Sequence, residues 1–160
     1  MRIGIGFDIH RLAEGRPMVL GGVNIPFPKG PEGHSDGDAL LHAICDAILG
    51  ALSKGDIGMR FPDTDPKYKD ISSKELLKDV KGLMDDKGLS VHNLDCVIIA
   101  EEPKIGPYRE EMAGVIADML GTSGGNISIK AKTAEKLGAV GKGEAVAAYV
   151  VVLLEEEDTR

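Results

Sequence analysis

Two segments that lie far apart in the sequence carry side chains able to bind a metal ion. Asp8 and His10 end the first apolar segment, and residues two apart on a strand point to the same side. His42 lies in a helix-like segment, where Leu41 and Ile44 place it near the buried side. Two histidines and one carboxylate with a fourth position open form the ligand set of a catalytic zinc site. The spacing equally allows a surface aspartate and packed histidines, so both interpretations stay open.

The surroundings of His42 add further candidates. A half-buried imidazole needs a hydrogen-bond partner, because an unsatisfied one costs on the order of 1–3 kcal/mol. Asp46 comes one helical turn later and is expected to orient the ring of His42 without binding the metal. His34 and Ser35 precede the same helix, where an imidazole and a hydroxyl form a natural anion pocket. Ser35 is also expected to cap the helix, which does not exclude contact with a ligand.

The segment from Gly55 to Asp70 shows no apolar periodicity and is expected to be a loop. Asp and Gly favour turns on their own account, so the composition alone permits a purely structural role. The length of the segment favours a lid or a loop that contacts substrate. Its candidate ligand-binding residues are Asp56, Ile57, Gly58, Phe61, Pro62, Asp63, Thr64 and Asp65.

Thr133 and Glu135 follow a predicted strand and offer a hydroxyl and a carboxylate. Glu135 is a candidate ligand for a hard cation, because Mg²⁺ typically takes one or two carboxylates and completes its shell with phosphate oxygens. The sequence has no Walker or Rossmann glycine fingerprint and no recognisable Ser/His/Asp order. The residues alone therefore indicate a metal-dependent enzyme that acts on a small phosphorylated molecule.

Strands and helices that alternate along the chain must position these side chains. Strands are expected at residues 2–10, 94–100, 126–132 and 145–154, with short extended pieces at 18–20 and 23–27. Helices are expected from residues 35–38 to before 55, from 72 or 73 to 88 with Glu75 in capping-box position, and from 107 to 120. The segment 133–143 is expected to be a loop. This order predicts an α/β or α+β fold with one core and helices on one or both faces of the sheet.

Length and composition set the outer limits. The 160 residues are expected to form one catalytic domain, residues 1–160, in which 155–160 is a solvated acidic tail. A net charge of −7 and 4% aromatic residues argue against nucleic-acid binding. The longest apolar run, residues 146–154, is too short to span a membrane, and no targeting signal is visible, so we expect a cytoplasmic protein. Cys45 and Cys96 are expected to be reduced core residues.

Several motifs taken together resemble the 2-C-methyl-D-erythritol 2,4-cyclodiphosphate synthase family of the non-mevalonate isoprenoid pathway. They lie at residues 6–10, 34–43, 55–58, 61–66, 133, 135–138 and 143–144, and the resemblance runs from residue 3 to about residue 153. It implies an α/β (α+β) fold with a single-layer mixed sheet, helices on one face, and assembly as a homotrimer. It also implies a lyase that cyclises a cytidine diphosphate ester of methylerythritol carrying a second phosphate, and that releases CMP.

The resemblance assigns roles to the candidate residues. It implies zinc at Asp8, His10 and His42, although manganese or cobalt would suit these donors, and a second ion, Mg²⁺ or Mn²⁺, at Glu135. It implies that His34 and Thr133 position phosphates and stabilise the transition state. Ser35, Ile57, Asp56, Gly58 and residues 61–65 would bind substrate, the last three matching the part of the site that binds methylerythritol. The cytidine pocket would comprise Ala100, Pro103, Lys104, Ile105 and Gly106.

Two residues depart from the common family pattern. Ala139 and Lys142 stand where many members carry an aromatic residue and an arginine that line the central cavity of the trimer. Lysine lacks the bidentate fork of arginine, so weaker binding of isoprenoid diphosphates there is expected, with the chemistry unaffected. Two other functions are compatible with the candidate residues. One is a zinc-dependent phosphoester hydrolase, and the other is a module that binds cytidine nucleotides or isoprenoid diphosphates.

Overall fold

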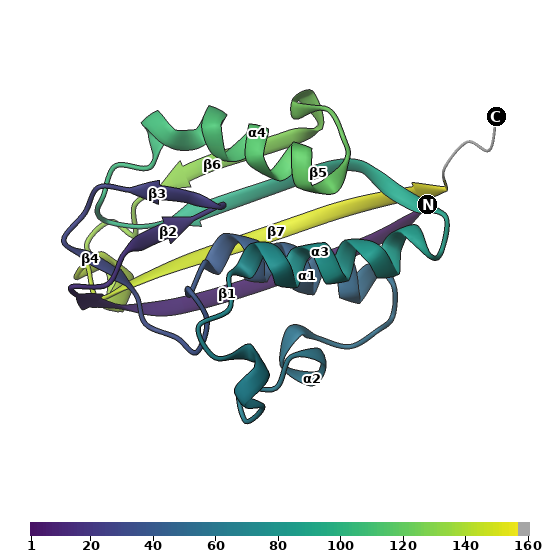
Figure 1. Ribbon diagram of the computed structural model, residues 1–160. Helices are drawn as coiled ribbons and strands as arrows, with labels where there is room; N and C mark the ends of the chain where they lie inside the picture. Colours follow the sequence, from purple (N-terminus) through teal and green to yellow (C-terminus); the bar gives the residue numbers. More distant parts are fainter. Residues whose placement is uncertain (157–160) are drawn as a thin grey trace.

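A mixed five-stranded sheet is the main structural element of the protein (Figure 1). The computed structural model describes residues 1–156. The strand order is β4 (Lys29–Pro31), β1 (Arg2–Glu14), β7 (Ala145–Glu156), β5 (Leu89–Ile99) and β6 (Ile127–Lys132). Only the β5–β6 pair is parallel among these neighbours. A separate hairpin joins β2 (Met18–Leu20) to β3 (Val23–Ile25).

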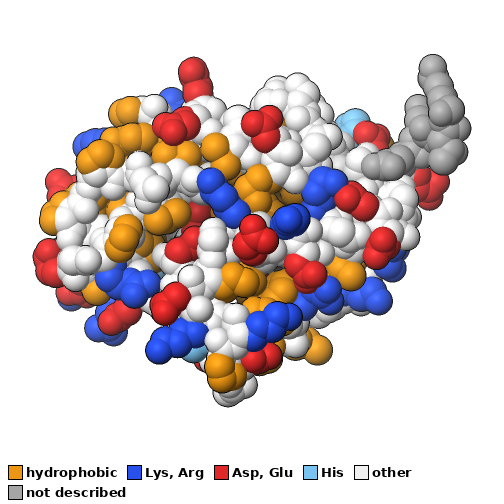
Figure 2. All heavy atoms as spheres, in the orientation of Figure 1, with side chains coloured by type: hydrophobic (Ala, Val, Ile, Leu, Met, Phe, Trp, Pro, Cys, Tyr) orange, Lys and Arg blue, Asp and Glu red, His pale blue; other side chains and the backbone are white. Residues whose placement is uncertain are grey.

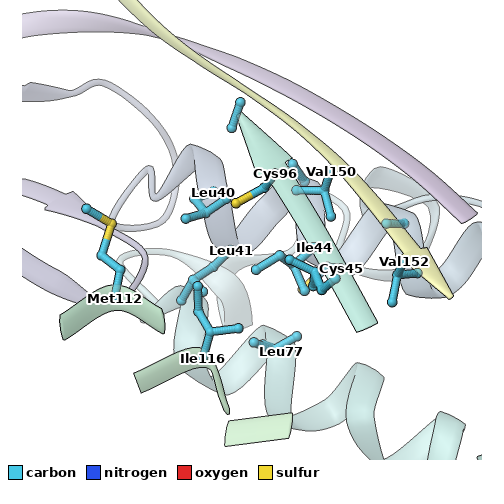
Figure 3. Packing of buried hydrophobic residues seen from close by; sticks show 14 of the residues in the cluster. Leu40, Leu41, Ile44, Cys45, Leu77, Cys96, Met112, Ile116, Val150 and Val152 are labelled. Carbon is cyan, nitrogen blue, oxygen red and sulfur yellow. The ribbon is translucent and has the colours of Figure 1, made fainter. Parts of the chain in front are cut away.

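Helices cover one face of this sheet, as predicted. The long ones are α1 (Ala39–Ala51), α3 (Ser73–Asp85) and α4 (Arg109–Leu120), and the short ones are α2 (Ile57–Arg60) and α5 (Gly138–Gly141). Three 3₁₀ turns lie at Pro66–Tyr68, Gly106–Tyr108 and Gly124–Asn126. Figure 3 shows how apolar side chains of α1, α3 and α4 pack with those of β5 and β7 to form the core. Cys45 and Cys96 are buried and free in this core, as expected.

Two glycines allow α1 to lie directly on β1. A Cβ atom at Gly4 would come 1.8 Å from the carbonyl oxygen of Ala47, and one at Gly6 would come 1.8 Å from that of Ala43. Any other residue at these positions would push the helix away from the strand. The close contact brings the first turn of α1, with His42, next to the segment of β1 that carries Asp8.

The opposite face of the sheet is apolar and open. Along β1 the alternate side chains Ile3 and Ile5 are 71% and 70% exposed, and Phe7 and Ile9 continue the row. Tyr149 and Val151 extend it on β7, and the rings of Phe7 and Tyr149 lie 4.6 Å apart. On the side of the molecule shown in Figure 2, acidic and basic side chains are interspersed rather than gathered by sign.

The structure corrects several predicted boundaries. Asp38, not Ser35, caps α1 and accepts a hydrogen bond from Leu41 N at 3.0 Å. The predicted loops contain helical turns, namely α2 and Pro66–Tyr68 in one and α5 in the other. The predicted acidic tail is wrong at its start, because Glu155 lies in β7 and accepts a hydrogen bond from His92 Nδ1 at 2.8 Å. Its remaining residues, 157–160, lie outside the described range, within which no helix is long and apolar enough to cross a membrane.

Candidate metal centre

The three predicted metal ligands converge in the structure. Asp8 and His10 project from the helix-covered face of β1, and His42 meets them from the first turn of α1. One potential ligand atom from each residue lies within 4.8 Å of the others. Asp8 Oδ2 is 3.0 Å from Nδ1 of His42 and 2.9 Å from Nδ1 of His10. The three residues thus form one cluster in the folded chain, and their binding of a metal ion stays a prediction.

The cluster favours an ionised aspartate. Burial raises the pKa of Asp8, but the two imidazoles beside it outweigh burial and lower that pKa from 3.8 to about 2. Burial lowers the pKa of His42, yet its hydrogen bond to Asp8 and the charges of Asp8, Asp38 and Asp36 leave the pKa raised. A negative oxygen therefore faces two nitrogen donors across the whole neutral pH range.

His10 provides the test of whether a metal fits. Its Nδ1 atom is buried, and within residues 1–156 it has no hydrogen-bond partner. It lies close to Asp8 Oδ2 but is not aligned for a hydrogen bond. A cation among the three side chains would satisfy this nitrogen, and two imidazoles with one carboxylate are donors that Zn²⁺ accepts. The residues present thus fit a zinc ion.

A cavity of about 270 Å³ opens beside the cluster. It brings the three metal-ligand candidates together with the predicted residues His34, Ser35, Ile57, Gly58, Phe61 and Asp63. Three further residues, Tyr68, Ile71 and Leu76, also line this cavity. They were not predicted, because an apolar or aromatic residue type does not distinguish a cavity wall from the core. The segment around α2 therefore forms one wall of this cavity, as a loop that contacts substrate would.

Four predicted loop residues do not line that cavity. Asp56 caps α2 by accepting a hydrogen bond from Met59 N at 2.8 Å, and Asp65 caps the 3₁₀ turn through Lys67 N at 3.0 Å. Pro62 and Thr64 lie between these two turns. Asp56 and Asp65 thus shape the loop locally, as the turn preference of aspartate predicts.

The expected partner of His42 is different from the one found. Asp46 accepts a hydrogen bond from Ile57 N at 2.7 Å and so anchors the start of α2, and no described hydrogen bond joins it to the ring. The ring instead has Nδ1 at Asp8 and Nε2 between two hydroxyls, Ser73 Oγ at 2.8 Å and Ser35 Oγ at 3.1 Å. Asp46 lies one turn along the helix, whereas the ring points to β1 and to the start of α3. The prediction for Asp46 is corrected accordingly.

A second cavity, of about 330 Å³, collects the predicted cytidine residues. Ala100, Pro103, Lys104, Ile105 and Gly106 all line it, together with Thr133 and with Arg109, Lys132, Ala131 and Glu101. Among the residues that the structure describes, none lines both this cavity and the one at the metal cluster. Glu135 is exposed and accepts a hydrogen bond from Thr133 Oγ1 at 2.8 Å.

The two unusual residues lie at α5. Ala139 is an exposed residue of that helix, and Lys142 follows it. Lys142 lines a third cavity, of about 350 Å³, with Lys29, Lys136 and Glu101 among its neighbours. Glu101 is paired with Lys136 Nζ at 2.8 Å, so part of the positive charge there is compensated.

Comparison with known proteins identifies the family. The model of the YgbB family matches residues 1–155. This chain belongs to the YgbB family. A curated relative, 2-C-methyl-D-erythritol 2,4-cyclodiphosphate synthase of Desulfatibacillum aliphaticivorans, is 56% identical over 155 residues, which are 97% of this chain and 100% of the relative.

Solved structures of the same kind superpose closely. The bifunctional IspDF of Campylobacter jejuni has a TM-score of 0.95 and 42% identity, and the match covers 99% of this chain but only 43% of that one. A CDP-bound structure of 2C-methyl-D-erythritol-2,4-cyclodiphosphate synthase has a TM-score of 0.89 and 40% identity, over 96% of this chain and 100% of that one. The YgbB-family fold is thus shared over nearly the whole described chain.

Proposed function

We propose that this chain is a phosphorus–oxygen lyase of isoprenoid precursor biosynthesis. It converts 4-diphosphocytidyl-2-C-methyl-D-erythritol 2-phosphate to 2-C-methyl-D-erythritol 2,4-cyclodiphosphate and CMP. The observation that carries this proposal is the convergence of Asp8, His10 and His42 beside a cavity. It occurs in a chain that is 56% identical over its length to a synthase of this name.

The reaction closes a ring within one substrate molecule. An oxygen of the 2-phosphate attacks the β-phosphorus, a new P–O bond forms, and the bond from the β-phosphorus to the CMP oxygen breaks, so that CMP leaves with the electron pair. The attacking oxygen is already anionic, so the enzyme needs no strong base. The protein must fold the substrate and screen repulsion between phosphates. His34, on the wall of the cavity beside the metal cluster (the metal-side cavity), and Thr133, in the second cavity (the cytidine-side cavity), would hold phosphate oxygens.

The metal cluster would serve that screening. Asp8, His10 and His42 would hold Zn²⁺, and the same donors would accept Mn²⁺ or Co²⁺. When bound, the ion supplies Lewis acidity to a phosphate oxygen. Glu135 would hold a second divalent ion, Mg²⁺ or Mn²⁺, because its exposed carboxylate follows Thr133 at the rim of the second cavity.

Two features support a homotrimer with composite active sites. The open face of the sheet presents a row of exposed apolar side chains, which monomers rarely leave uncovered. The metal-side and cytidine-side cavities of one chain share no described lining residue, yet the reaction needs both halves of the substrate in one place. Trimers would join the first cavity of one chain to the second cavity of its neighbour. Ala139 and Lys142 would then face the trimer axis and bind isoprenoid diphosphates weakly.

Phosphorus NMR of the purified, zinc-loaded protein with its diphosphocytidyl substrate tests the proposal. We expect the cyclic diphosphate and CMP in equal amounts. Linear phosphate products would favour a zinc-dependent hydrolase, and binding without turnover would favour a nucleotide-binding module. Either outcome would overturn the synthase assignment.

A further inference from the structure

We propose that Glu101 is a positioning residue that holds the turn after β6, residues 133–136, and so fixes Thr133 and Glu135 at the cytidine-side cavity. The proposal rests on the proposed function for the roles of Thr133 and Glu135. Sequence analysis gave Glu101 no role, although it lies between residues assigned to the cytidine pocket.

Glu101 follows the end of β5 and directs its carboxylate to this turn. The residue is 9% exposed, and its Oε1 atom pairs with Lys136 Nζ at 2.8 Å. Its Oε2 atom is buried, and within residues 1–156 no donor is aligned with it for a hydrogen bond. The ammonium of Lys136 lowers the pKa of Glu101 despite burial, and the backbone N–H groups of Lys136 and Ala134 act in the same direction. An ionised carboxylate therefore contacts the turn from the end of β5.

The turn has a backbone conformation that its residue types do not favour. Glu135 and Lys136 have φ values of 51° and 64°, in the left-handed region that residues other than glycine rarely adopt. Two such residues in succession persist only when their surroundings hold them. Gly141 of α5 packs against this backbone, because a Cβ atom there would come 2.2 Å from the carbonyl carbon of Lys136. Glu101 provides a second hold through the side chain of Lys136.

The conformation of the turn determines where the proposed functional groups lie. Thr133 Oγ1 donates a hydrogen bond to Glu135 Oε1 at 2.8 Å and accepts one from Glu135 N at 3.4 Å. Thr133 also lines the cytidine-side cavity, with Lys132 and Arg109. A change in the backbone at Glu135 would therefore displace both the hydroxyl and the carboxylate. A displacement of about 1 Å in a catalytic group can reduce the rate by about 100-fold.

Glu101 also lines the cytidine-side cavity, so direct contact with the nucleotide is the alternative role. The geometry favours positioning. Oε1 is paired with Lys136 and Oε2 is buried, so neither oxygen is open to a nucleotide. The two roles differ in their kinetics, because direct contact affects mainly KM, whereas displacement of Thr133 and Glu135 affects mainly kcat.

Limited digestion with trypsin tests the hold on the turn without substrate. Cleavage after Lys136 requires the turn to open, so its rate follows the population of the open form. We expect Glu101→Ala to accelerate this cleavage by about tenfold, on the scale of one lost charge-assisted hydrogen bond. Cleavage after the exposed Lys54 is the internal reference and should stay within about twofold. Mass spectrometry of the fragments measures both rates.

Steady-state kinetics with the diphosphocytidyl substrate test the consequence for the reaction. We expect Glu101→Ala to lower kcat by about 10- to 100-fold and to change KM by less than about threefold. Glu101→Gln keeps an acceptor of the same shape and should retain kcat within about threefold of wild type. Glu102→Ala removes the neighbouring exposed carboxylate and should change neither kcat nor the rate of cleavage after Lys136. Glu101→Asp, whose shorter side chain does not reach Lys136, replaces Glu101→Ala if that variant does not fold.

Unchanged cleavage after Lys136 together with unchanged kcat in folded Glu101→Ala would overturn the proposal. A raised KM with unchanged kcat and unchanged cleavage would also overturn it, because it would show direct contact with the nucleotide. If the wild type formed no cyclic product while Glu101→Ala still accelerated cleavage, the proposed function would fail and the hold on the turn would stand. The digestion needs no substrate, so the two failures are distinguishable.

Discussion

The metal-side and cytidine-side cavities are built in different ways. The first is lined by side chains that other residues hold in place. His42 is buried, and its ring nitrogens lie within hydrogen-bond distance of Asp8, Ser35 and Ser73. The second lies along loops that follow β5 and β6, and its residues Lys104 and Thr133 are exposed. This difference indicates that one chain arranges the three metal-ligand candidates by itself, whereas the residues proposed to bind cytidine lie on an open surface.

Removal of a proposed metal ligand is expected to have the largest effect, on both zinc content and catalytic rate. His42→Ala should abolish stoichiometric zinc and reduce kcat by about 10³-fold or more, because Lewis-acid stabilisation amounts to several kcal/mol. Metal analysis and steady-state kinetics check this. His92→Ala, an exposed histidine paired with Glu155, is the control and should retain both. One zinc per chain in His42→Ala would show that the ligand assignment is wrong.

A substitution at the contact of α1 with β1 is expected to have the next largest effect, on the free energy of unfolding. Gly6→Ala places a Cβ on the carbonyl oxygen of Ala43, so the unfolding free energy should fall by about 3 kcal/mol. Denaturant titration measures it. Gly82→Ala is the matched control, because nothing lies within 4 Å of its Cβ position on α3, and it should stabilise the protein by about 0.5–1 kcal/mol. Equal effects of the two substitutions would contradict the close helix–strand contact.

The prearranged cluster also predicts a pH dependence of stability without metal. The pKa of Asp8 is lowered to about 2, so its stabilisation is complete above the unfolded value of 3.8 and is lost as the pH falls toward 2. The loss is about 2 kcal/mol. The pKa of His42 is raised, so its contribution is present at low pH and is lost as the pH rises past its folded value. Urea unfolding of metal-free Asp8→Asn should show no such decrease in unfolding free energy as the pH falls toward 2. An unchanged decrease would mean that another group causes it.

Substitutions in the cytidine-side cavity are expected to have smaller effects. Lys104→Ala is expected to raise KM for the diphosphocytidyl substrate by about tenfold, on the scale of one lost charge-assisted hydrogen bond, and to leave zinc content unchanged. Lys54→Ala, exposed after α1, is the control. A loss of zinc in Lys104→Ala would show that the two cavities are not independent within the chain.

Local patterns predicted much of the fold. The apolar periodicity of α1 and α3 and the long apolar run of β7 were sufficient to place these elements, and the i, i+2 spacing put Asp8 and His10 on one face. The strand β4 contains Gly and Pro, which weaken any strand signal, and it was missed. The cap of α1 was assigned to Ser35 instead of Asp38, since either residue type suits that position.

Long-range contacts set the limit of prediction at the site. Nothing in the spacing of Gly4 and Gly6 shows which helix will approach them, although that approach joins His42 to Asp8. The link from Asp36 through Ser73 to His42 joins three separate segments, so only the folded chain shows it. Asp46 lies one helical turn from His42, but its carboxylate accepts a hydrogen bond from a backbone N–H of α2 instead.

Mixed oligomers of two inactive variants test most directly whether the two cavities work together across chains. His42→Ala lacks the metal half and Thr133→Ala lacks part of the cytidine half, so each alone should have little activity. Co-expressed in equal amounts, they should recover about a quarter of wild-type activity. In randomly mixed trimers, about that share of sites combines an intact metal half from one chain with an intact cytidine half from its neighbour. Mixtures no more active than the two variants alone would contradict the composite site.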